Sequence, residues 1–86
     1  MRKLNEECGV FGIYSPFTCD VASSVYYGLF SLQHRGQESC GIVVNDDGLF
    51  TTHKDEGIVN DVFTHQILNS LGEGNIAIGH VRYGTS

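Results

Sequence analysis

Basic residues are scarce in this chain, and several features that would assign it to other classes of protein are missing. Five lysines and arginines stand against ten aspartates and glutamates, for a formal net charge of −5 over 86 residues. That balance offers no basic surface for nucleic acid or for an acidic membrane. No apolar run approaches the roughly 18 residues that a membrane-spanning helix needs. We therefore expect neither nucleic acid nor a membrane among the partners of this chain.

Cysteine is present, but not in the patterns of disulfide frameworks or metal sites. The three cysteines are an odd number without a CxxC pair, and residues 1–7 lack the apolar stretch of a secretory signal. These features indicate reduced thiols in a cytoplasmic protein. The four histidines do not have the spacing of zinc ligands, and no glycine-rich phosphate loop or dinucleotide fingerprint is present. We expect no metal and no cofactor within this sequence.

Periodic apolar residues predict one small α+β domain. Strands are expected at residues 8–14, 39–45, 49–54 and 75–81. Helices are expected at residues 20–33 and from residue 60 or 61 to residue 71. Their apolar faces consist of Val21, Val25, Leu29 and Leu32 in the first helix and Phe63, Ile67 and Leu71 in the second. The order strand, helix, strand, strand, helix, strand indicates a sheet covered by helices.

Capping and turn residues mark the predicted boundaries of these elements. Asp20 is a good N-cap for the first helix, and Gly36 is expected to end it. The Asp-Asp-Gly sequence at residues 46–48 predicts a hairpin turn, and Gly72 is expected to end the second helix. Residues 15–18, which contain the only proline, are predicted to form a loop.

Cys8 lies at the head of the first expected strand. A free thiol has a pKa of about 8.5, so nucleophilic catalysis needs a base nearby. If residues 1–7 were removed, Cys8 would carry its own α-amine, whose reference pKa of about 7.7–8.0 suits a general base. The alternative interpretation of Cys8 is a small buried apolar residue, the usual role of a free cysteine. Cys19 and Cys40 are assigned to that role.

Three segments resemble the class II glutamine amidotransferases, which are N-terminal-nucleophile (Ntn) hydrolases. They are CGVFGI at residues 8–13, LQHRGQESCGI at residues 32–42 and GHVRYGT at residues 79–85. The segments occur in the order of that family and together cover almost the whole chain. The middle segment is most similar to the members that act in purine synthesis. A lone Cys-Gly pair would carry no weight, whereas the three segments together favour the catalytic interpretation of Cys8.

The resemblance implies roles for five residues. Cys8 would be the nucleophile that attacks the side-chain amide of glutamine, releasing ammonia and leaving a γ-glutamyl thioester. Arg82 would bind the α-carboxylate of glutamine through two parallel hydrogen bonds. Tyr83 and Thr85 would line the same pocket from a loop that follows the last strand. Arg35 would order the site beside the nucleophile, in addition to its local role at a helix C-terminus.

The resemblance also implies the surroundings of this site. The fold would be the N-terminal part of an Ntn-hydrolase αββα sandwich, incomplete in this chain. Residues 1–7 would be a cleavable leader, and residues 8–86 part of the amidotransferase domain. An oxyanion-hole Asn-Gly pair and an aspartate that grips the glutamine amine would follow further along. Phosphoribosyl pyrophosphate would accept the ammonia in another domain. The full-length protein would also bind Mg²⁺ and assemble as a homo-oligomer, and it could carry the iron–sulfur cluster that leader-bearing members often have.

Other interpretations remain open at this point. Sister amidotransferases share the nucleophile and the arginine, so the acceptor of ammonia could be another molecule. An inactive, truncated relative would act only as a binding module. A thiol enzyme of papain type would need one of the four histidines beside Cys8 and would be active with its leader attached. The histidines are His34, His53, His65 and His80.

Overall fold

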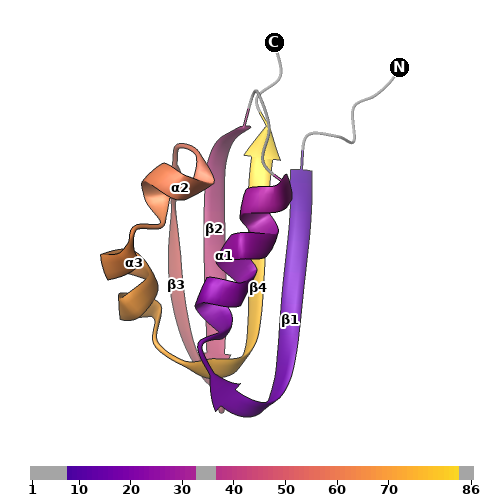
Figure 1. Ribbon diagram of the computed structural model, residues 1–86, viewed down its shortest axis with the longest axis vertical. Helices are drawn as coiled ribbons and strands as arrows, with labels where there is room; N and C mark the ends of the chain where they lie inside the picture. Colours follow the sequence, from indigo (N-terminus) through magenta and orange to yellow (C-terminus); the bar gives the residue numbers. More distant parts are fainter. Residues whose placement is uncertain (1–7, 33–36, 84–86) are drawn as a thin grey trace.

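The computed structural model describes residues 8–32 and 37–83, which form one four-stranded sheet with helices on one face (Figure 1). The elements are β1 (Cys8–Cys19), α1 (Val21–Leu32), β2 (Gln37–Asp46), β3 (Leu49–Glu56), α2 (Val59–Val62), α3 (His65–Leu71) and β4 (Gly74–Tyr83). The predicted order of strands and helices is confirmed, apart from a division of the second helix. Among the described residues, no helix is long and apolar enough to cross a membrane.

The strands lie in the order β1-β4-β2-β3, and every neighbouring pair is antiparallel. The last strand of the sequence, β4, therefore lies between the first two, while β1 and β3 form the edges. Figure 1 shows that β1 begins and β4 ends at the same end of the sheet. Residues from opposite ends of the chain are brought side by side there.

Helix α1 forms where its cap and apolar face predict it. The Asp20 carboxylate accepts hydrogen bonds from the backbone N–H of Ser23 at 3.1 Å and from its hydroxyl at 2.7 Å. The first of these bonds satisfies a donor that has no partner within the helix. Val25 and Leu29 are fully buried, so the predicted apolar face packs against the sheet. The predicted end at Gly36 lies outside the described residues.

A two-residue turn joins β2 to β3 at the predicted position. Asp47 (φ 54°) and Gly48 (φ 91°) both adopt the left-handed backbone conformation that such hairpins favour. The side-chain oxygen of Asn45 accepts a hydrogen bond from the Gly48 N–H at 2.8 Å. This turn sets the register of the hairpin as far as Ser39, which lies opposite Glu56.

The prediction of a loop at residues 15–18 is wrong, because β1 continues through them to Cys19. The pairing of β1 with β4 shifts register between Tyr14 and Cys19, which accommodates the irregular stretch. Pro16 is tolerated because β1 is an edge strand, where a missing N–H donor costs little. Cys19 was expected to be buried, but it is exposed at the end of this strand.

The second predicted helix is interrupted and forms α2 and α3. The break falls at Phe63 and Thr64, where the Thr64 hydroxyl accepts a hydrogen bond from the Ile67 N–H at 3.2 Å and caps α3. Phe63 and Leu71 are nevertheless buried, with 2% and 3% of their surface exposed. Gly72 ends α3 with φ 74°, as predicted. The expected apolar face reaches the core although the helix is broken.

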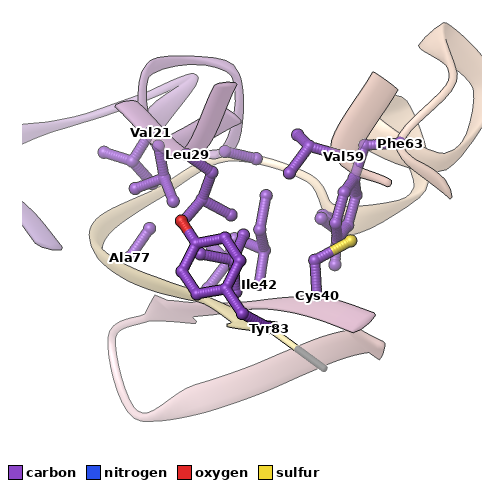
Figure 2. Close-up of a cluster of buried hydrophobic side chains, with 13 residues drawn as sticks. Val21, Leu29, Cys40, Ile42, Val59, Phe63, Ala77 and Tyr83 are labelled. Carbon is purple, nitrogen blue, oxygen red and sulfur yellow. The ribbon is translucent and has the colours of Figure 1, made fainter. Parts of the chain in front are cut away.

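The helix-covered face of the sheet holds the hydrophobic core (Figure 2). Strand residues alternate between the two faces, so Ala77 and Val81 of β4 and Ile42 of β2 are fully buried. Helix α1 approaches β4 closely at Gly79, where a Cβ would lie 2.5 Å from the Cγ1 of Val25. The core consists of Val21, Ala22, Val25, Leu29, Cys40, Ile42, Val44, Val59, Phe63, Leu71, Ala77, Val81 and Tyr83.

The opposite face of the sheet, called the open face below, exposes large apolar side chains. Val10 and Tyr14 on β1, Ile78 on β4 and Phe50 on β3 are between 51% and 70% exposed. The described helices all pack against the other face (Figure 1). A sheet that is covered on one side only and apolar on the other is the arrangement expected of one half of a two-sheet sandwich.

Candidate active site

One residue from each strand is registered in a row across the sheet, at the end where β1 begins and β4 ends. Cys8 is registered opposite Arg82. Ser39 lies on the other side of Arg82, and Glu56 lies opposite Ser39. Neighbouring strands lie about 4.8 Å apart, so the row spans roughly 14 Å. The predicted nucleophile and the predicted carboxylate-binding arginine are thus neighbours, although they lie near opposite ends of the chain.

Arg82 lies within β4, not in the loop expected after it. Its position is registered between Cys8 on β1 and Ser39 on β2, so both neighbouring strands hold it in place. Val81 and Tyr83 are buried in the core, whereas Arg82 is exposed on the open face. The sheet therefore presents a permanently charged guanidinium group from a backbone that is paired on both sides.

A cavity of ≈ 200 Å³ lies beside this row. Glu38, Ser39, Glu56 and Arg82 line it. One cation and two carboxylates therefore surround a single space. Charges of both signs in one cavity suit a ligand that itself carries both.

Tyr83 lies on the face of the sheet opposite Arg82. Its ring belongs to the core (Figure 2), and its hydroxyl donates a hydrogen bond to the carbonyl oxygen of Leu32. Burial raises the pKa of this hydroxyl above its ordinary value of 10.0. Leu32 is the last residue of α1, whose final carbonyls lack partners within the helix. Tyr83 thus ties the end of α1 to β4, and its predicted place in the glutamine pocket stays a prediction.

For three other predicted site residues, the structure gives only a backbone position or no description. Arg35 and Thr85 lie outside the described residues. Cys8 is the first described residue and is placed here by its register alone. Cys40 is fully buried, as predicted, and its thiol donates a hydrogen bond to the Gly57 carbonyl at 3.6 Å.

His80 shares the open face with Arg82, but its ring lies over β2. A Cβ on Gly41 would lie 2.6 Å from the Nε2 of His80, so the glycine leaves room for this ring. Strand β2 is on the far side of β4 from β1. His80 therefore leans away from Cys8 and is not placed as its base.

The remaining histidines give no support to a papain-type site. His53 packs against Phe63 with ring centroids 5.7 Å apart, and His65 begins α3. His34 lies outside the described residues. Across residues 8–32 and 37–83, no three His, Cys, Asp or Glu side chains are grouped as metal ligands.

Glu56 and Glu38 were not among the predicted site residues. Glu56 lies outside the three segments that resemble the family, and the resemblance implied no role for Glu38. The signal for Glu56 was nevertheless present in the sequence. Counting outward from the two-residue turn at residues 47–48 places Glu56 opposite Ser39. The order of the strands, which brings Ser39 beside Arg82, is a tertiary feature and had no local signal.

Comparison with curated proteins finds relatives with about half of their aligned residues identical. The chain is 52% identical over 81 residues to the amidophosphoribosyltransferase of Mycobacterium tuberculosis (strain H37Rv), covering 94% of this chain and 15% of that protein. The Methanocaldococcus jannaschii enzyme of that name is 52% identical over 79 residues, 92% of this chain and 17% of the relative. The Bacillus subtilis enzyme is 49% identical over all 86 residues, again 17% of its length. The chain thus spans less than a fifth of these relatives. No family model matches it.

Two solved structures share the fold. One, described as the allosteric regulatory enzyme of purine biosynthesis, has a TM-score of 0.73 and 49% identity over 88% of this chain and 16% of its own. The other is the B. subtilis glutamine phosphoribosylpyrophosphate amidotransferase complexed with ADP and GMP, with a TM-score of 0.71 and 48% identity over 90% of this chain and 16% of its own. The predicted fold is confirmed. By sequence and by fold, the chain is therefore related to the amidophosphoribosyltransferases and matches the N-terminal part of their Ntn-hydrolase fold.

Proposed function

We propose that this chain supplies the glutamine-hydrolysing part of an amidophosphoribosyltransferase of purine synthesis. The register that places Cys8 directly opposite Arg82 carries the proposal. It brings the residue suited to attack an amide beside the residue suited to bind the α-carboxylate of the same substrate. The relatives with about half of their residues identical support the same overall reaction.

Removal of residues 1–7 is the step that makes Cys8 reactive. While Glu7 is attached, the nitrogen of Cys8 is an amide and has no basic lone pair. Cleavage of that bond creates an α-amine, whose reference pKa is about 7.7–8.0, on the same residue as a thiol, whose reference pKa is about 8.5. Because the two groups share one residue, little entropy is lost in bringing base and nucleophile together.

The reaction then proceeds in two halves. The α-amine takes the thiol proton, and the Cys8 sulfur attacks the carbonyl carbon of the glutamine side chain. The carbon–nitrogen bond breaks, the nitrogen leaves as ammonia with the proton from the α-ammonium, and a γ-glutamyl thioester remains. Water attacks the thioester with the amine as base, which releases glutamate. Oxyanion donors contribute roughly 100- to 1000-fold in rate and are expected from residues outside this sequence.

Arg82 selects free glutamine by binding its α-carboxylate through a bidentate pair. The ammonia displaces pyrophosphate from phosphoribosyl pyrophosphate and forms phosphoribosylamine, in a domain outside this sequence. Mg²⁺, any iron–sulfur cluster and the contacts of a homo-oligomer are likewise assigned to the full-length protein.

N-terminal sequencing and intact mass of the protein from its natural source provide the first test. We expect a chain that begins at Cys8 and is much heavier than the 9.4 kDa of these residues. A natural protein that keeps Met1 and ends at Ser86 would leave Cys8 without its base and would refute the catalytic role.

Replacement of the nucleophile provides the second test. In the full-length protein, Cys8→Ala should lower glutamine-dependent activity by roughly 1000-fold or more and leave ammonia-dependent activity intact, because only the thioester step is lost. Cys19→Ala is the matched control, since Cys19 is an exposed cysteine at the other end of the same strand. Equal activity of both variants with glutamine would count against the proposal.

A further inference from the structure

The cavity beside Arg82 contains charges that binding of a carboxylate does not explain. Glu38 and Glu56 line it together with Arg82, and both are exposed. Two carboxylates near a guanidinium weaken its attraction for an anionic ligand, because like charges repel. Their presence is explained if the ligand also brings a positive charge.

Glu56 is the better placed of the two carboxylates. It is registered opposite Ser39, which is registered opposite Arg82, so Glu56 and Arg82 lie on the same face of the sheet. Two strand spacings, about 10 Å, separate their backbones. Glu38 lies at the register irregularity between Gln37 and Ser39, where strand alternation does not set its face. The cavity thus has a cation on β4 and a carboxylate of defined face on β3.

The backbone after Glu56 is anchored to the neighbouring strand and to the core. The Gly57 N–H donates a hydrogen bond to the Glu38 carbonyl at 2.7 Å. The buried Cys40 thiol donates to the Gly57 carbonyl at 3.6 Å. Gly57 has φ 126°, a conformation that other residues rarely adopt. The Glu56 carboxylate is therefore presented from a held position at the end of β3.

We propose that Glu56 binds the α-ammonium group of glutamine while Arg82 binds its α-carboxylate. This assignment rests on the proposed function, since it concerns the same substrate in the same site. An alkylammonium group has three N–H donors and accepts several partners. Glu56 therefore acts together with the aspartate that the family resemblance places outside this sequence. With both charged groups of the free amino acid recognised, an amide that lacks either one is bound less well.

Inhibition by two anions that differ in one group tests this assignment in the full-length protein. Glutamate carries the α-ammonium group, and glutarate is the same molecule without it. Glu56→Gln should raise the inhibition constant of glutamate about 10-fold, as expected for loss of one charge-assisted hydrogen bond. The inhibition constant of glutarate should not rise and should fall somewhat, because the variant removes a negative charge that repels this anion. The KM for glutamine should rise by a similar factor with little change in kcat. Glu56→Asp, which keeps the charge, should restore much of the affinity for glutamate.

Glu73→Gln is the matched control, because it removes the same charge with the same change of side chain. Glu73 is exposed and directly precedes β4, and Arg82 lies near the other end of that strand. At about 3.4 Å per residue, roughly 27 Å separates Arg82 from the start of the strand. We expect the inhibition constants of glutamate and glutarate to be unchanged in this variant.

Three results would overturn the assignment of Glu56. In the first, Glu56→Gln weakens the binding of glutamate and glutarate equally, which would show that Glu56 acts through Arg82 or the fold. In the second, Glu56→Gln weakens the binding of neither anion. In the third, the selective loss of glutamate affinity appears with Glu38→Gln and not with Glu56→Gln. If the wild-type protein hydrolyses glutamine and Glu56→Gln changes nothing, only this inference fails. A wild-type protein without glutaminase activity would refute the proposed function, and this inference with it.

Discussion

The two faces of the sheet differ in what they hold. On the helix-covered face, Ala77 and Val81 of β4 are fully buried. On the open face of the same strand, Ile78 is 51% exposed and Arg82 is also exposed. Arg82 and Glu56, which belong to the row that begins at Cys8, are both exposed on the open face. Strand alternation thus separates the residues that stabilise the fold from those proposed to act on the substrate.

Arg82 and Tyr83 show this separation between neighbours in the sequence. The resemblance placed both residues in one glutamine pocket, yet they lie on opposite faces and contact different groups. Tyr83 donates to the carbonyl of Leu32, whereas Arg82 lines the open cavity. Substitutions on the two faces should therefore change different measurements, activity for the open face and the free energy of unfolding for the covered one.

Among the substitutions that compare the two faces, Arg82→Met should have the largest effect on activity. Loss of a bidentate charged pair should lower kcat/KM for glutamine by about 100-fold or more, since each hydrogen bond to a charged group contributes about 1.5–3 kcal/mol. The free energy of unfolding should change much less than it does for a core residue, because the side chain lines the cavity and does not belong to the hydrophobic core. Steady-state kinetics and urea unfolding of the full-length protein measure the two quantities. A variant that loses stability as strongly as activity would contradict the division between the faces.

A pair of glycines compares the faces directly through stability. Gly79→Ala places a methyl group 2.5 Å from the Cγ1 of Val25 and 2.7 Å from the Cδ1 of Leu29, and should cost about 1–3 kcal/mol in unfolding free energy. Gly12→Ala, on the open face of β1, meets its nearest described atoms only at 3.7 Å and should therefore cost less than Gly79→Ala. Urea unfolding of both variants gives the comparison. Equal losses would show that the open face is packed as tightly as the covered one.

Tyr83→Phe should have a smaller effect, and on stability alone. It removes one hydrogen bond to the Leu32 carbonyl and should cost about 1 kcal/mol in unfolding free energy. The kcat/KM for glutamine should stay within a few-fold of the wild type. A loss near that of Arg82→Met would instead support the predicted place of Tyr83 in the glutamine pocket.

The pH dependence of the same variant sharpens this result. Burial raises the pKa of Tyr83, so its neutral form is favoured in the folded state. The unfolded chain, with a pKa near 10, loses this proton first as the pH rises. The stability that Tyr83 contributes is therefore complete below about pH 10 and falls as the pH rises above it. The difference in unfolding free energy between wild type and Tyr83→Phe should shrink as the pH rises above about 10.

Local signals predicted most of the elements correctly. The cap at Asp20, the turn at residues 47–48 and the stop at Gly72 all appear where the sequence placed them. Each depends on hydrogen bonds or backbone conformation within a few residues, so a short window of sequence contains the cause. The break at Thr64 had a local signal too, because threonine is a common N-cap. The helical spacing of apolar residues continues across this position, however, and therefore predicted one unbroken helix.

Predictions that depended on distant partners were less accurate. Residues 15–18 look like a loop in isolation, and only pairing with β4 extends β1 to Cys19. Arg82 belongs to β4 because β1 and β2 pair with it on either side, and Tyr83 belongs to β4 because β2 pairs with it at Gln37. The face on which Tyr83 lies follows from that pairing, so no local pattern contained it.

The sequence by itself determined the α+β order, the hairpin and the residues proposed for chemistry, since periodicity, turn residues and motifs are local properties. Only the tertiary structure decided that β4 lies between β1 and β2, which sets Cys8 opposite Arg82 and brings Glu56 to the same cavity. Hydrogen bonding between strands joins residues that are far apart in the chain. The apolar face of α1 selects the side of the sheet that is covered, and the proposed active site is left on the other.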